Sequence, residues 1–196
     1  YITEARLRSR FEQLRDDGYR VLPLDEALRR LYSGTLPPRA VALTFDDGTT
    51  DFGVRVAPLL EEFDYPATLY LTTYYCVNRM LVFDTALRYV LWKGAGSGGD
   101  VSRALPDPGA PPAPVATAAE RERALAAVLR VVREHHLDAT AKQELLARVS
   151  SAVGVDLASI ADLGMYQILT PEAVRALPAG LVDVQLHTHR HRTPRE

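Results

Sequence analysis

Cysteine, tryptophan and methionine are all scarce in this sequence. Of its 196 residues, one is cysteine, one is tryptophan and two are methionine. With Cys76 as the single cysteine, no disulfide can form within the chain, which excludes a disulfide-stabilised scaffold. No apolar run approaches the roughly 20 residues that span a bilayer, so we expect no membrane-spanning helix in this stretch. Stability must come from an ordinary apolar core, for which 47% hydrophobic residues are sufficient.

The sequence also lacks a strong excess of charge of either sign. Lys and Arg number 23 against 25 Asp and Glu, which gives a formal net charge of −2. Without a basic stripe, we expect no nucleic-acid partner. No signal peptide is visible at the start of the chain, and the sequence does not indicate an oligomeric state.

Short strands that alternate with helices indicate an α/β fold. Apolar runs at 40–45 and 67–71 are predicted strands, and the residues between them include a predicted helix at 54–63. This strand–helix–strand spacing predicts parallel pairing with a right-handed crossover. The run at 40–45 is expected to be buried on both faces. A further strand is predicted at 181–186.

The middle of the chain has a different character. Residues 78–165 are predicted to form a helical insertion, with strong helical periodicity at 119–136. Within it, residues 94–118 are rich in Gly, Pro, Ala and Ser, which predicts a flexible surface segment. Trp92, also in the insertion, is expected to lie in its core.

Two clusters of chemically active side chains follow predicted strands. Asp46 and Asp47 follow the apolar part of the stretch VALTFDDGT at 41–49, and His187, His189 and His191 lie within five residues. The carboxyl ends of parallel strands gather active-site residues, so we expect both clusters at one edge. His187 and His191 have the i, i+4 spacing that lets two imidazoles share a divalent ion. One aspartate could then complete the metal site, and the other could accept a proton from water.

The motifs TFDDG at 44–48 and HTHRH at 187–191 resemble the first two motifs of the polysaccharide deacetylase family, the NodB homology domain (carbohydrate esterase family 4). The flanking stretches FEQLRDDGYRVLPLDEAL, APLLEEFDYPATLYL and ILTPEAVRAL are similar to the surroundings of these motifs in the family. The resemblance implies a distorted (β/α) barrel, partial in this chain. It also implies one divalent metal, usually zinc, with Co²⁺, Ni²⁺ or Mn²⁺ as alternatives.

The resemblance implies a role for each motif residue. Asp46 corresponds to the general base, and the metal ligands correspond to Asp47, His187 and His191. His189 fills a variable position of the motif and is not assigned to the metal. Tyr74 and Tyr75, after the strand at 67–71, are candidates for stacking on sugar rings.

The implied activity is hydrolysis of acetyl groups, N-acetyl ahead of O-acetyl, on an acetylated polysaccharide such as chitin or peptidoglycan. The enzyme class is a hydrolase of linear amides, and its expected location is the cell envelope or outside the cell, with the cytoplasm as an alternative. The family's remaining motifs, which include the catalytic acid, normally lie downstream of the second motif. We therefore expect residues 1–196 to form a single catalytic domain that is incomplete at both ends.

The same residues suggest three other interpretations. FDDGT is superficially similar to the D-x-D-G-T motif of haloacid dehalogenases, but adjacent carboxylates on a strand point to opposite sides, and a histidine pair favours zinc over Mg²⁺. His187, His189 and His191 would share one face of a continuing strand, which would make a three-histidine metal site. The remaining alternative is a non-catalytic carbohydrate-binding relative with the same fold.

Overall fold

A computed structural model describes residues 2–189 of the chain. The chain divides into two compact units. The first comprises the described residues up to Arg79 together with those from Gln167 onward, and the second is Met80–Tyr166. Each unit has a hydrophobic core of its own.

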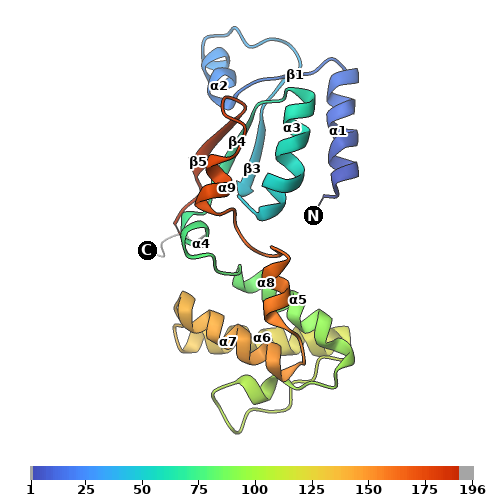
Figure 1. Cartoon of the computed structure of the whole chain (residues 1–196), viewed down its shortest axis with the longest axis vertical. Helices are drawn as coiled ribbons and strands as arrows, with labels where there is room; N and C mark the ends of the chain where they lie inside the picture. Colours follow the sequence, from blue (N-terminus) through green and yellow to red (C-terminus); the bar gives the residue numbers. More distant parts are fainter. Residues whose placement is uncertain (1, 190–196) are drawn as a thin grey trace. The chain divides into compact units, whose positions relative to one another are not determined.

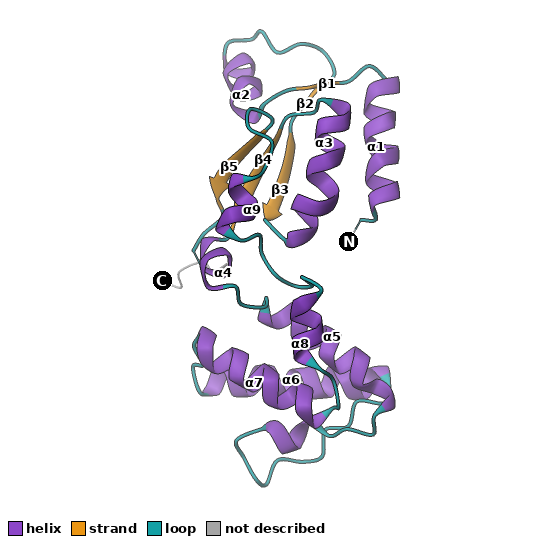
Figure 2. Cartoon of the chain, in the orientation of Figure 1, coloured by secondary structure: helices purple, strands orange, loops and turns teal. Residues whose placement is uncertain are grey.

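The strands of the first unit form two parallel sheets. Strands β1 (Arg20–Val21) and β2 (Ala40–Val41) pair with each other. The larger sheet has the order β3–β4–β5, with β3 at Leu43–Asp47, β4 at Ala67–Leu71 and β5 at Val182–Leu186 (Figure 2). The expected α/β class is therefore confirmed. The described strands make open sheets, and closure into a barrel stays a prediction.

Helices α1 (Glu4–Asp16) and α3 (Ala57–Phe63) lie beside β3, with α3 between β3 and α1 (Figure 1). The ring of Phe11 on α1 meets the rings of Phe63 and Tyr65 edge-on, with centroids 5.6 and 5.4 Å apart. A π-helical turn at Phe52–Val56 precedes α3. The unit also contains α2 (Leu24–Tyr32), α4 (Thr73–Asn78) and α9 (Pro171–Arg175).

The predicted strand at 40–45 is divided between β2 and β3, which belong to different sheets. Strand β3 also differs from its prediction in its end and in its burial. It extends through Asp46 and Asp47, two residues beyond the predicted end of the strand. It is also not buried on both faces: Leu43 and Phe45 pack against the core, whereas Thr44 and Asp46 are exposed. The alternation has the two-residue period of a strand that is covered on one side, as is usual when helices lie on a single face.

The second unit is helical. Its helices are α5 (Phe83–Lys93), α6 (Ala118–Glu134), α7 (Ala139–Ala152) and α8 (Leu157–Asp162). Thr117 and Glu120 form a reciprocal capping box at the start of α6. Short 3₁₀ turns occupy 94–96 and 101–104. No helix between residues 2 and 189 is long and apolar enough to cross a membrane.

Residues 94–118 supply several buried side chains to the core of this unit. Val101, Ala104, Ala113 and Val115 are all buried there. Apolar residues within the Gly/Pro-rich stretch thus anchor it, and its flexibility stays a prediction.

Trp92 was wrongly predicted to be in the core, because 59% of it is exposed. The buried stripe of α5 follows helical spacing through Leu87, Val90 and Leu91, and Trp92 falls outside that stripe.

Candidate functional site

The carboxyl ends of β3, β4 and β5 lie level with one another. Asp47, Leu71 and Leu186 are partners in the parallel register. Two backbone hydrogen bonds continue the sheet by one residue: Thr72 N–H donates to the Asp47 carbonyl (3.1 Å), and His187 N–H donates to the Leu71 carbonyl (2.9 Å). The end of β4 therefore joins the chain segments that carry Asp47 and His187.

The side chains of Asp47 and His187 meet at this edge. Asp47 Oδ1 lies 3.6 Å from His187 Nε2, and the two side chains are 40% and 32% exposed. The hydroxyl of Thr72, a residue with 1% exposure, donates a long hydrogen bond of 3.5 Å to the same Asp47 oxygen. The structure thus brings together one residue from each sequence cluster, in a position open to solvent.

The backbone around this pair is unusual. Asp47 and Gly48 both have positive φ, 69° and 75°, and Gly48 N–H donates to the Asp46 carbonyl at 2.9 Å to close a tight turn. Thr188, next to His187, has φ 58°. A β-branched residue at positive φ is a genuine outlier, and such strain concentrates at functional sites.

Asp46 lies one residue before Asp47 and is exposed. Because successive strand residues point to opposite faces, its carboxylate belongs to the face of the sheet that carries Tyr70 and Gln185, its register partners. The ring of Tyr70 lies 6.4 Å from the ring of His187. Tyr70 therefore links the face that carries Asp46 to His187, the residue that meets Asp47.

His189 is attached to the first turn of α4. Its Nδ1 lies 2.9 Å from the Thr73 hydroxyl, and its carbonyl accepts from Tyr74 N–H at 2.8 Å. Strand β5 ends at Leu186, so residues 187–189 do not form the continuing strand that a three-histidine site would need. His191 lies outside the described residues.

The weaker site candidates belong to the same helix. Tyr74 and Tyr75 lie on α4 with their rings edge-to-face at 5.6 Å, and the Tyr74 ring also meets His189 edge-on at 5.4 Å. The position of residues 72–75 after the strand at 67–71 suggested a pocket lining, but the contacts of Thr72 with Asp47 and of Thr73 with His189 were not predicted. Two successive threonines directly after the strand at 67–71 were the available signal.

A carboxylate and an imidazole are donors that suit a divalent ion such as zinc, which usually takes three or four protein ligands. In the part of the chain that the structure describes, no three His, Cys, Asp or Glu side chains gather into a metal-binding group. Asp47 and His187 would therefore need a further ligand, the role that the motif gives to His191.

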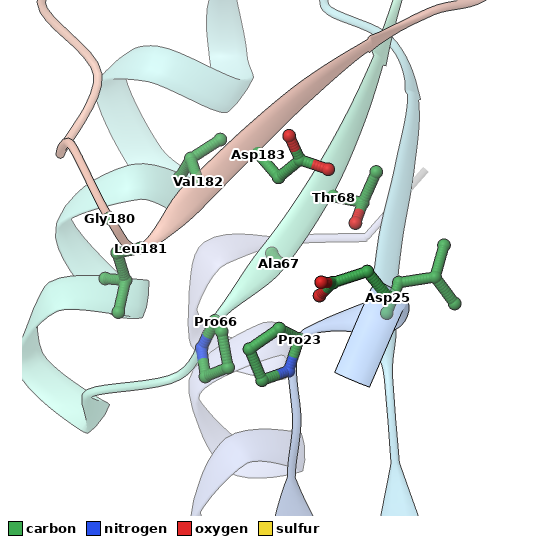
Figure 3. A pocket seen from close by; sticks show the side chains of 10 residues that line it. Pro23, Asp25, Pro66, Ala67, Thr68, Gly180, Leu181, Val182 and Asp183 are labelled. Carbon is green, nitrogen blue, oxygen red and sulfur yellow. The ribbon is translucent and has the colours of Figure 1, made fainter. Parts of the chain in front are cut away.

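A hollow of about 220 Å³ lies at the opposite, amino-terminal end of the sheet. Figure 3 shows Asp25, Thr68 and Asp183 around it. Asp25 is paired with Arg29, and Asp183 accepts hydrogen bonds from Gln185. Because Ala67 and Val182 begin the strands that Leu71 and Leu186 end, this hollow is separate from the candidate site.

Residues 33–95 match the family model described as "Polysaccharide deacetylase". The chain is also 40% identical over 68 residues to the poly-beta-1,6-N-acetyl-D-glucosamine N-deacetylases of Escherichia coli K12 and O157:H7. That alignment covers 34% of this chain and 10% of each relative. The resemblance indicated by TFDDG is confirmed by these matches, and the matched family segment contains Asp46 and Asp47 but not His187.

Three solved structures are similar in part. The deacetylase domain of BpsB from Bordetella bronchiseptica is 35% identical over 36% of this chain and 27% of its own, with a TM-score of 0.33. The Streptococcus pyogenes deacetylase PplD, in complex with acetate, is 30% identical over 38% of this chain and 34% of its own, with a TM-score of 0.37. A de-N-acetylase from Aggregatibacter actinomycetemcomitans is 17% identical over 98% of this chain and 87% of its own, also with a TM-score of 0.37. These TM-scores are too low to establish a shared fold.

Proposed function

Taking the polysaccharide deacetylase segment as the premise, we propose that this chain is part of a metal-dependent hydrolase that removes N-acetyl groups from a polysaccharide. The observation that carries the proposal is the meeting of Asp47 and His187, 3.6 Å apart, at the carboxyl ends of β3 and β5. The two residues come from separate motifs far apart in the sequence. Their proximity is what a shared divalent ion requires.

The metal ligands in this proposal are Asp47, His187 and His191, with zinc as the preferred ion. A bound divalent ion would polarise the acetyl carbonyl and make a water molecule more acidic. The Thr72 hydroxyl donates to the Asp47 carboxylate, and the Thr72 backbone N–H donates to the Asp47 backbone carbonyl. His187 is held in place by its N–H bond to the Leu71 carbonyl.

Asp46 is the proposed general base. Its carboxylate is exposed, and its register partner Tyr70 lies beside His187, so it is available to accept a proton from the attacking water. The division of roles explains why two like charges stand side by side: one binds the cation and the other handles the proton.

The proposed substrate is a polymer that contains N-acetylglucosamine. Two relatives are named for acting on poly-beta-1,6-N-acetyl-D-glucosamine, and chitin and peptidoglycan carry the same acetamido group. Tyr74 and Tyr75, on α4 beside the site, are proposed to contact sugar rings. We also propose that the open β3–β4–β5 sheet belongs to a distorted barrel and that residues 78–165 are an insertion in it.

The test is an acetate-release assay on the purified protein, with these polymers and acetylxylan as substrates. Asp46→Asn should reduce turnover by about 100-fold or more and leave Zn²⁺ affinity near that of the wild type. His187→Ala should lower both the turnover and the Zn²⁺ affinity. Glu62→Gln, on the exposed α1–α3 ion pair, is the control and should change neither.

Full acetate release by Asp46→Asn would remove Asp46 from the role of base. Polymer binding by the wild type without any acetate release would instead favour the non-catalytic carbohydrate-binding alternative.

A further inference from the structure

The segment after β5 is held against the first turn of α4 by three contacts. The Thr73 hydroxyl lies 2.9 Å from His189 Nδ1, Tyr74 N–H donates to the His189 carbonyl at 2.8 Å, and the Tyr74 and His189 rings meet at 90° with centroids 5.4 Å apart. We call Thr73, Tyr74 and His189 the His189 clamp. The proposed function gives none of these contacts a role.

The clamp is continuous with the candidate metal site. Thr72, which precedes it, donates hydrogen bonds to Asp47: from its N–H to the backbone carbonyl and from its hydroxyl to the carboxylate. Three consecutive residues, 72–74, therefore touch both chain segments that carry proposed ligands. A change in Thr73 would loosen 187–189 without altering any ligand.

The backbone between the two histidines shows that this segment is constrained. His187 is fixed on one side by its bond to Leu71, and His189 is fixed on the other by the clamp. Thr188 between them has φ 58°. A β-branched residue keeps such a conformation only when its surroundings over-determine it.

We propose that Thr73 and Tyr74 are positioning residues: through His189 they hold residues 187–189 so that the His187 side chain faces Asp47 before any metal arrives. The proposal rests on the proposed function, in which Asp47 and His187 are ligands. A site that is ordered in only a fraction of molecules binds its ligand more weakly by that same fraction. The clamp thus increases metal affinity without touching the metal.

The first measurement is Co²⁺ affinity by titration of the metal-free chain. Thr73→Val keeps the shape and the β-branch but removes the hydroxyl, and should raise the Kd about tenfold, the lower end of the range for residues that support a ligand. Thr73→Ser restores a hydroxyl and should return the Kd to near the wild-type value. Thr85→Val removes a hydroxyl that bonds Val82 in the second unit and should leave the Kd unchanged.

The second measurement needs no metal. In the metal-free chain, Thr73→Val should speed hydrogen exchange of the Tyr74 amide several-fold, because its acceptor is the His189 carbonyl. The Thr72 amide, which bonds Asp47, is the internal reference and should keep its rate.

A raised Kd together with faster Tyr74 exchange supports the proposal. It is overturned if either quantity is unchanged in Thr73→Val, or if Thr73→Ser behaves like the valine variant. A wild-type chain that binds no Co²⁺ would overturn the proposed metal site instead, and the exchange rates would still decide whether Thr73 orders residues 187–189.

Discussion

Gly48 directly follows the two aspartates at the end of β3. Two properties make glycine necessary there. Its φ is 75°, and a Cβ at this position would stand 2.5 Å from Leu71 Cδ1. Leu71 is itself buried, with 6% exposure, so it has little room to move away. The tight turn after Asp47 therefore depends on the absence of a side chain.

Gly48→Ala should destabilise the protein by about 1–3 kcal/mol more than Gly34→Ala. Gly34 is the matched control because its φ is 70° and nothing lies within 4 Å of its Cβ position, so both variants bear the cost of positive φ and only one bears a clash. Urea unfolding followed by circular dichroism measures the difference. Equal losses would mean that Leu71 moves aside without cost.

For single residues, the sequence indicated the candidate site residues better than the residues that hold them in place. Asp46, Asp47 and His187 could be named because their residue types and their places after strands carry the signal. The hydroxyl contacts of Thr72 with Asp47 and of Thr73 with His189 could not, because they join residues 25 and 116 positions apart and leave no local pattern.

Helix boundaries were predictable where the capping residue is local. Thr3, Asp138 and Thr170 are residue types that favour helix N-caps, and each accepts a hydrogen bond from the first turn of its helix. The end of β3 was not predictable in the same way. Asp-Asp-Gly favours a turn by composition, but pairing with β4 extends the strand through Asp47.

A side chain also organises the Gly/Pro-rich stretch of the second unit. Asp100 Oδ1 accepts from the backbone N–H of Ser102 (2.9 Å) and from that of Ala113 (2.8 Å). Desolvation raises the pKa of Asp100, but these hydrogen bonds together outweigh it, so the pKa lies below its usual value. The ionised carboxylate therefore stabilises the folded form.

Because the folded pKa is depressed, this contribution is complete above the unfolded value of about 3.9 and is lost as pH falls through the lower folded value. Asp100→Ala should cost about 1–3 kcal/mol at pH 7, since two amides lose their acceptor. Asp100→Asn keeps an oxygen acceptor and should cost less. The loss of unfolding free energy in Asp100→Asn relative to the wild type should shrink when urea unfolding is repeated near pH 3. A loss that stays constant would contradict the stabilising role of the ionised Asp100 carboxylate.

For the whole molecule, the separate cores of the two units predict separate responses to mutation. Trp92, the single tryptophan, lies in the second unit and reports on it. A Cβ on Gly99 would stand 2.5 Å from Val153 Cα and 2.7 Å from the Ala152 carbonyl, whereas nothing lies within 4 Å of that position on Gly96. These two contacts, the shortest at Gly99, are with backbone atoms, which cannot rotate away.

Gly99→Ala should therefore lower the stability of the second unit by about 1–3 kcal/mol, and Gly96→Ala should be close to neutral. Tryptophan fluorescence during urea unfolding measures the stability of this unit. Zn²⁺ affinity, a property of the first unit, should be unchanged in both variants. A fall in Zn²⁺ affinity in Gly99→Ala would show that the two units are coupled.

The arrangement of the whole sheet was only partly predictable. The β3–β4 pairing follows from the strand–helix–strand spacing, whereas the place of β5 beside β4 does not, because more than 100 residues separate the two strands. Barrel closure depends on strand pairs that no local pattern encodes.

Anomalous diffraction at the zinc absorption edge, from crystals grown with Zn²⁺, tests the central claim most directly. We expect one strong peak about 2.0–2.2 Å from a carboxylate oxygen of Asp47 and a ring nitrogen of His187, with His191 as the next ligand. A peak bound by other residues, or Asp47 and His187 left without metal at saturating Zn²⁺, would contradict it.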